Sequence, residues 1–277
     1  MQLTQKHRDS FVIWFCILFY LLMIYKWANG LFLYQLEPHI FNTRFDFTTW
    51  LLMNTGIHKW LINNPAGCLT MDITFYISPL LYLILYKTNQ KSSLIFAGVM
   101  LVINFTYLQC YTLFPANSIE SFTAWLLFPL LLMMPTISSF YFVLNGLRYF
   151  FLFVLSSAAI WKFVQMGIFN PQEMSGVLLY QHKEFLVSSP NTFYTTFIYW
   201  LVNHPTISFG LYAIATGLEL IFLVGFINKK KDNYLILLFI IFLVMDLIIM
   251  RIPYWELSPF VLTLIFGRFN RPTTYTQ

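Results

Sequence analysis

The chain has 277 residues, of which 58% are hydrophobic and only 10% are charged. Water-soluble domains usually carry about 25% charged residues, because they cannot bury a larger apolar surface. The composition therefore excludes a soluble globular protein and indicates an all-α polytopic membrane protein in contact with membrane lipid. The formal net charge of +5 does not indicate a nucleic-acid partner, because the basic residues fall at the ends of apolar runs.

Apolar runs divide the chain into about eight expected membrane spans. A helix needs about 20 predominantly apolar residues to cross a bilayer. The predicted spans are Phe11–Leu33, Leu69–Tyr86, Ser93–Phe114, Phe122–Leu144, Leu147–Phe169, Ile207–Ile227, Tyr234–Met250 and a shorter one at Pro259–Gly267. The segment that begins at Pro253 leads into this last span. Pro79, Pro129 and Pro135 lie inside these spans and should kink them. We expect one transmembrane helix bundle over residues 1–277.

Lysine and arginine residues indicate the orientation of this bundle. If the N-terminus is inside, the cytoplasmic set is Lys6, Arg8, Lys87, Lys91, Arg148, Lys229, Lys230, Lys231, Arg268 and Arg271. The smaller outer set is Lys26, Arg44, Lys59, Lys183 and Arg251. This excess follows the positive-inside rule, and an even number of spans would leave both termini in the cytoplasm. We interpret the chain as a multi-pass protein of a bacterial inner membrane.

Two long segments, residues 34–68 and 170–205, would then lie on the outer side. Apolar residues recur in both at helical spacing, namely Trp50, Leu51, Ile57, Trp60 and Leu61 in the first, and Phe193, Phe197, Trp200 and Leu201 in the second. This pattern is typical of amphipathic helices that lie at the membrane interface. An alternative is a lid over a pocket that faces outwards.

Three ionisable residues, Lys162, Glu219 and Asp246, occur inside predicted spans. Hydrocarbon does not solvate charges, so such residues usually pair with one another or line a functional site. At a helical rise of about 1.5 Å per residue, Lys162 lies about 21 Å beyond Arg148, in the outer half of the membrane. Asp246 is expected at a similar depth, and Glu219 near the midplane. The sequence therefore predicts Lys162, Glu219 and Asp246 as candidate catalytic residues.

Other polar residues are expected near these three. Tyr212, Thr216 and Glu219 share one face of their helix, because they are spaced i, i+4 and i+7. Candidate substrate-binding residues are Tyr212, Thr216, Gln165, and the residues at the outer ends of spans, Asp72 and Arg251. The alternative is structural, since Lys162 with Glu219 or Asp246 could form an ion pair that locks helices together. The sequence leaves open which carboxylate Lys162 meets.

The three cysteines, Cys16, Cys68 and Cys110, show no CxxC motif and no metal-binding spacing, so no metal site is expected. Cys68 and Cys110 both fall near outer helix ends. They could form a disulfide in an oxidising compartment or remain two thiols.

The segment Ser156-Ser157-Ala158-Ala159-Ile160-Trp161-Lys162-Phe163, followed by Asn170-Pro171 and Met174-Ser175-Gly176, carries a resemblance to a known family. It resembles bacterial "horizontally transferred transmembrane domain" proteins, relatives of vitamin-K-dependent γ-carboxylase and, more distantly, of DoxX-like proteins. The resemblance places Lys162 at the lysine that deprotonates the reduced quinone in the carboxylase. It also implies a glutamate before a basic turn, which Glu219 and Lys229–Lys231 match.

These observations favour a membrane-embedded enzyme, carboxylase-like or dependent on a quinol, with menaquinol or a related lipid quinone as its lipid-soluble partner. Two alternatives stay open: a transporter or channel with a charged translocation site, and a scaffold subunit of an envelope complex. The sequence indicates no particular protein partner. It contains no GxSxG or HExxH motif and no glycine-rich phosphate loop, which argues against a hydrolase, a metalloprotease and a nucleotide-binding enzyme.

Overall fold

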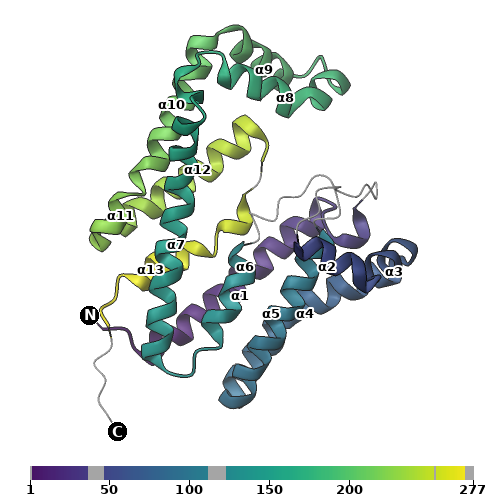
Figure 1. Cartoon of the computed structure of the whole chain (residues 1–277), viewed down its shortest axis with the longest axis vertical. Helices are drawn as coiled ribbons and strands as arrows, with labels where there is room; N and C mark the ends of the chain where they lie inside the picture. The colour runs from purple at the N-terminus through teal and green to yellow at the C-terminus, as the bar shows by residue number, and fades with distance from the viewer. Residues whose placement is uncertain (1, 37–46, 112–122, 253, 272–277) are drawn as a thin grey trace. The chain divides into compact units, whose positions relative to one another are not determined.

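The computed structural model describes residues 2–36, 47–111, 123–252 and 254–271, and its regular structure is helical (Figure 1). The predicted all-α fold is confirmed. In these ranges the one extended pairing is a bridge between Gln2 and Asn270. The chain divides into two compact units, of which unit 1 comprises Met1–Asn145 with Trp255–Gln277 and unit 2 comprises Gly146–Tyr254.

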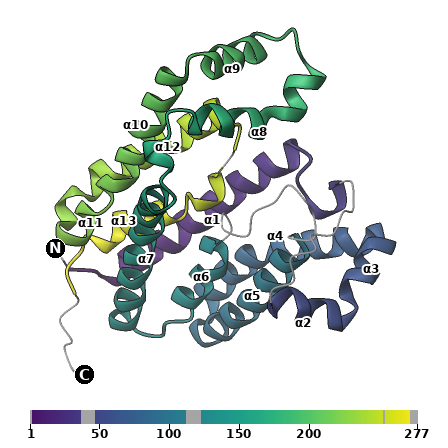
Figure 2. The same cartoon turned by 45° about the horizontal axis from the view of Figure 1, so that its top comes forward.

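Unit 1 is built mainly on long apolar helices. Its elements are α1 (Gln5–Ala28), η1 (Leu33–Gln35), α2 (Phe47–Thr55), α3 (Ile57–Asn63), α4 (Pro65–Thr88), α5 (Gln90–Tyr111), α6 (Thr123–Leu132), the beginning of α7 (Ile137–Val164), η5 (Trp255–Leu257) and α13 (Phe260–Gly267). Figures 1 and 2 both show α4 and α5 side by side. Local sequence sets the start of α4, because the side chain of Asn64 accepts a hydrogen bond from the Ala66 amide and Pro65 occupies the first turn.

Aromatic side chains form the core of unit 1. Phe11, Phe15 and Phe19 follow one another at i, i+4 spacing along α1 and are buried. Their rings meet those of Trp125 and Phe128 on α6, with centroids 4.9–5.7 Å apart. Because lipid tails are as apolar as these side chains, close ring packing rather than exclusion from water holds α6 against α1.

A break at Pro135 separates α6 from α7. Proline lacks an amide hydrogen and disfavours helical geometry in the preceding residue. Thr136 and Ser139 restart the helix with a reciprocal cap, in which each side-chain oxygen accepts from the other residue's amide. The carbonyl oxygens of Met134 and Pro135 accept from the guanidinium of Arg8 at 2.7 and 3.4 Å. Arg8 is fully buried and thereby satisfies backbone groups that the break leaves open.

Unit 2 begins within α7 and continues through η3 (Gly167–Phe169), α8 (Glu173–Ser188), α9 (Phe193–Asn203), α10 (Pro205–Ile221), α11 (Val224–Ile227), η4 (Lys229–Lys231) and α12 (Asp232–Met250). A buried ion pair connects α7 with α12. Arg148 donates to both carboxylate oxygens of Asp232 at 2.6 and 2.8 Å and to the Gly225 carbonyl at 2.8 Å. Gly225 is required nearby, because an added Cβ would lie 2.7 Å from a methyl carbon of Leu152.

Six helical segments in the described part of the chain are long and apolar enough to cross a membrane. They are Gln5–Gln35, Pro65–Thr88, Gln90–Tyr111, Ile137–Val164, Pro205–Ile227 and Lys229–Met250. The expected count of about eight is not confirmed. Residues 122–144 do not form one span, because the Pro135 break leaves the ten-residue α6 and starts α7 early. The last expected span corresponds to the short apolar helix Trp255–Gly267.

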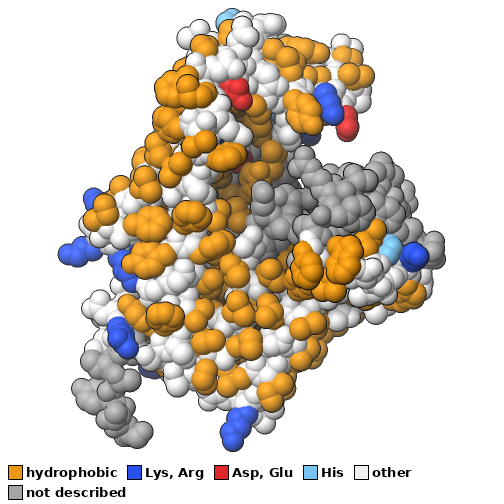
Figure 3. All heavy atoms as spheres, viewed as in Figure 1, with side chains coloured by type: hydrophobic (Ala, Val, Ile, Leu, Met, Phe, Trp, Pro, Cys, Tyr) orange, Lys and Arg blue, Asp and Glu red, His pale blue; other side chains and the backbone are white. Residues whose placement is uncertain are grey.

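The exposed surface of the long helices suits a lipid environment. Hydrophobic side chains spread over the face shown in Figure 3, and Lys and Arg lie mostly near its edges. Exposed apolar residues include Leu21 on α1, Ile84 on α4 and Ile248 on α12. A multi-pass membrane protein explains such exposure, because these side chains replace protein contacts with lipid contacts.

The described parts of the two segments predicted to be amphipathic contain the helices α2, α3, α8 and α9, and residues 37–46 lie outside the described residues. On α9 the buried face differs from the predicted stripe. Thr195, Ile198 and Leu201 are buried, whereas Phe193 is 90% exposed and Trp200 is exposed as well. Phe193 and Trp200 therefore face away from unit 2's own core, as the rings of an interfacial helix do, whereas Tyr194 and Phe197 pack against that core.

The buried pair Arg148–Asp232 gives a testable prediction. We expect Arg148→Ala to lower the free energy of unfolding in detergent by about 3–5 kcal/mol, because Asp232 then stays buried without a counterion. Unfolding followed by circular dichroism measures this change. The control Lys231→Ala removes an exposed cation and should change stability by less than about 0.5 kcal/mol. Equal losses in the two variants would contradict the prediction.

Candidate functional site

Lys162 lies in the last turn of α7 and pairs with Glu219 on α10. Its Nζ donates to both carboxylate oxygens of Glu219 at 2.8 Å. The Glu219 side chain is 6% exposed, whereas that of Lys162 is 24% exposed. The choice that the sequence left open is thus resolved in favour of Glu219. The difference in exposure means that a molecule outside the protein can reach the amine while the carboxylate stays covered.

Tyr212 and Thr216 lie on the same helix as Glu219, as the spacing predicted. The Nζ of Lys162 lies 5.3 Å from the ring centroid of Tyr212, within the range of a cation–π interaction. Thr216 is buried, and its hydroxyl donates to the Tyr212 carbonyl at 2.8 Å. The Thr216 side chain is therefore satisfied within its own helix. Tyr212, in contrast, contacts the lysine and belongs to the site.

Gly167 and Glu173 also belong to this neighbourhood, although sequence reasoning did not select them as site residues. A Cβ added at Gly167 would lie 3.0 Å from the Tyr212 hydroxyl and 3.4 Å from Cγ of Glu173. Met166, the residue before Gly167, has left-handed backbone geometry with φ 60°, which ends α7 and turns the chain. No feature of the sequence indicates the positive φ at Met166. Gly167, however, follows the charged end of α7, and a glycine at such a place can indicate that another part of the chain approaches its backbone closely.

Asp246 on α12 is the third ionisable group of the site. It is half-buried and lies close enough to Lys162 and Glu219 for their charges to interact. No hydrogen bond from the described residues is directed at its carboxylate. One ammonium therefore faces two carboxylates, and the cluster carries one surplus negative charge when all three groups are ionised. A surplus carboxylate in an apolar setting favours uptake of a cation or a proton.

The remaining predicted residues have separate surroundings. Gln165 is exposed at the end of α7. Asp72 belongs to unit 1, where it accepts hydrogen bonds from the Leu33 and Tyr34 amides at 3.1 Å and from the Tyr107 hydroxyl at 2.7 Å. Of the five ionisable candidates that the sequence offered, Lys162, Glu219 and Asp246 lie together, all in unit 2.

Arg251 caps the end of α12 and takes part in a different cluster. Its guanidinium lies 4.2 Å from the ring centroid of Phe185 and 5.1 Å from that of Tyr194. His182 and Tyr194 both donate to the Ile249 carbonyl, at 2.9 and 3.1 Å. These contacts hold α8 and α9 against the end of α12, which gives Arg251 a structural role beside them.

His182 is buried in this cluster, and burial lowers its pKa below the usual 6.5. The hydrogen bond to the Ile249 carbonyl opposes this shift, while the positive charge of Arg251 adds to it. The folded protein therefore favours the neutral imidazole.

Of the two states that the sequence left open for Cys68 and Cys110, a disulfide or two thiols, the structure shows thiols. Cys68 and Cys110 are buried in unit 1, and no disulfide joins them in the structure. Over the described ranges, no three His, Cys, Asp or Glu side chains are grouped so that they could hold a metal ion.

No protein-family model matches the chain, and no curated protein or solved structure is detectably similar to it. The chemistry of the Lys162 cluster is therefore the main guide to function.

The lowered pKa of His182 predicts how stability depends on pH. Above pH 6.5 the imidazole is neutral in both the folded and unfolded chains. As pH falls below 6.5, the unfolded chain gains the proton first, so stability should decline. The slope below pH 6.5 should become shallower in His182→Gln. It should stay unchanged in His204→Gln, which alters an exposed histidine of the same unit. Thermal unfolding between pH 5 and 8 tests this, and equal slopes in all three proteins would refute it.

Proposed function

We propose that unit 2 carries a proton-exchanging site for a lipid-soluble quinol, and that the protein is a membrane-embedded, carboxylase-like redox enzyme. The observation that carries the proposal is the partly exposed ammonium of Lys162, held at 2.8 Å from both oxygens of a covered carboxylate. A purely structural ion pair would be covered on both sides, as Arg148–Asp232 is. The sequence resemblance around Lys162 supports the same assignment.

The chemistry requires a group that takes a proton from the quinol hydroxyl. Lys162 becomes a base once its own proton has moved to Glu219 along one of the 2.8 Å hydrogen bonds. The quinol O–H bond then breaks, its proton passes to the amine, and the resulting ammonium stabilises the quinolate oxygen. Asp246 provides a second proton acceptor close by. Tyr212 places an aromatic ring beside the amine, a suitable surface for the flat head group of a naphthoquinone such as menaquinol.

Under this proposal the protein resides in a bacterial inner membrane. The excess of Lys and Arg at the ends of alternate apolar runs supports cytoplasmic termini, with Lys162 in the outer half of the bilayer. The lipid phase itself would deliver the quinol, because the ligand is as apolar as the surface of the long helices.

Extraction of the purified protein tests the proposal. We expect menaquinone or a related lipid quinone to co-purify with the intact chain, detected by mass spectrometry of the lipid extract. Lys162→Ala should retain about tenfold to a hundredfold less, because a lost hydrogen bond to a charged group costs about 1.5–3 kcal/mol. Lys183→Ala, which removes an exposed lysine of α8, serves as the matched control. Equal quinone content in Lys162→Ala and the control would refute the proposal.

A second function, a proton-coupled transporter, is favoured by one specific observation, the surplus carboxylate. Asp246 lies in a long apolar helix without a cation of its own, as proton-carrying residues of transporters do.

Proteoliposomes loaded with a pH-sensitive dye distinguish the two functions. If the protein is a transporter, dissipation of a pH gradient should fall to background in Asp246→Asn and stay unchanged in Glu184→Gln. An enzyme would show no flux in the intact chain.

A further inference from the structure

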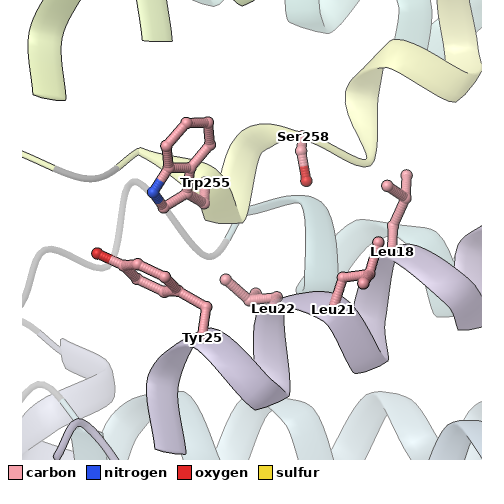
Figure 4. A pocket seen from close by; sticks show the side chains of 6 residues that line it. All are labelled: Leu18, Leu21, Leu22, Tyr25, Trp255 and Ser258. Carbon is pink, nitrogen blue, oxygen red and sulfur yellow. The ribbon is translucent and has the colours of Figure 1, made fainter. Parts of the chain in front are cut away.

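A second site lies in unit 1, between the C-terminal half of α1 and η5. It is a cavity of about 250 Å³, and Figure 4 shows the side chains that line it. They are Leu18, Leu21, Leu22, Tyr25, Trp255 and Ser258. None of these residues takes part in the Lys162 site, so the inference drawn from them is independent of the proposed function.

Most of the lining is apolar, and its two aromatic residues lie at one end. In Figure 4 the hydroxyl of Tyr25 and the indole nitrogen of Trp255 lie at the same end, the leucines extend away from it, and the hydroxyl of Ser258 lies on the side of Leu18 and Leu21. Tyr25 lies three residues before the end of α1, whereas Leu18 lies about 10 Å further along the helix axis. Tyrosine and tryptophan near the end of a span mark the membrane interface. The cavity therefore extends from the interface into the hydrocarbon region.

An ion pair between the residues that follow Tyr25 and Trp255 holds the two sides of this cavity together. Lys26 and Glu256 directly follow Tyr25 and Trp255 in sequence, and their side chains form a contact of 2.8 Å. Both side chains are buried, at 2% and 8% exposure. The pair joins η5 to α1 and so sets the separation of the two rings, whose centroids are 6.4 Å apart. The buried ion pair thus connects the two elements that line the cavity.

The cavity is continuous with a surface that contacts lipid. Ile17, Leu21 and Ile24 are exposed on α1, which is long and apolar enough to span the membrane. Leu21 belongs both to this surface and to the cavity lining. A molecule that diffuses in the bilayer can therefore enter from the side, while its polar end stays at the interface.

We propose that this cavity binds one acyl chain of a membrane phospholipid, with the glycerol ester beside Tyr25 and Trp255. The ester carbonyl would accept a hydrogen bond from the Tyr25 hydroxyl, which itself accepts one from the Trp255 side chain, while the methylenes contact Leu18, Leu21 and Leu22. The aromatic end of the cavity and the leucines beyond it match the order of ester and methylenes along a phospholipid. The inner end adds one hydroxyl, that of Ser258, to a lining made of leucines.

The full-length protein in nanodiscs tests the proposal with a phosphatidylcholine probe that carries a diazirine in one acyl chain. After illumination and digestion, we expect labelled peptides to be enriched at residues 18–25 and 255–258. Leu21→Trp fills the cavity and should lower this labelling severalfold. Ile24→Trp adds the same volume at an exposed position of α1 outside the cavity, and should leave the labelling unchanged.

Two further measurements keep the outcome decisive. Ser258→Phe fills the cavity from the residue that follows η5 and should reproduce the effect of Leu21→Trp. Size-exclusion profiles of all variants should match that of the intact chain. Uniform labelling along all exposed spans, or equal labelling in Leu21→Trp and Ile24→Trp, would overturn the proposal. Labelling by a diazirine fatty acid but not by the phospholipid probe would overturn the choice of ligand.

Discussion

Hydrocarbon cannot solvate a charge, and this constraint shapes the interior of both units. Arg148 and Asp232, far apart in sequence, meet in unit 2 and satisfy each other with two hydrogen bonds. Lys26 and Glu256 form a buried contact of 2.8 Å in unit 1, where they join the first long helix to η5. Burying each pair costs desolvation energy. Each pair also fixes the position of its helices, because a shifted helix would leave a buried charge without a partner. The ion pairs thus specify how helices dock.

The Lys162–Glu219 pair follows the same rule but is incompletely covered. Its ammonium is reachable from outside, and Asp246 adds a carboxylate without a cation of its own. Asp72 offers a useful contrast, because three donors surround it and leave little reason for it to exchange a proton. Exposure and surplus charge, rather than the mere presence of an ion pair, distinguish a reactive site from a structural one in this molecule.

The apolar runs predicted the helical class, and the ionisable residues inside them predicted Lys162, Glu219 and Asp246 as neighbours. The spacing of apolar and charged residues did not indicate which residues meet in the folded chain. Arg8 and Arg148 look like residues at membrane edges, because lysine and arginine usually mark helix ends. Both are buried, since a proline break supplies open carbonyls to one and Asp232 supplies a carboxylate to the other. Sequence spacing carries no information about such long-range pairing, nor about which carboxylate Lys162 would choose.

The contact between Arg8 and the break before α7 has a consequence for biogenesis. Arg8 leaves the ribosome more than a hundred residues before the carbonyls of Met134 and Pro135 that accept its hydrogen bonds. Until those carbonyls are in place, water or lipid head groups must solvate its guanidinium. The contacts of the Arg8 side chain in the folded unit can therefore form only after α6 and the start of α7 have been synthesised, although α1 precedes both in the chain.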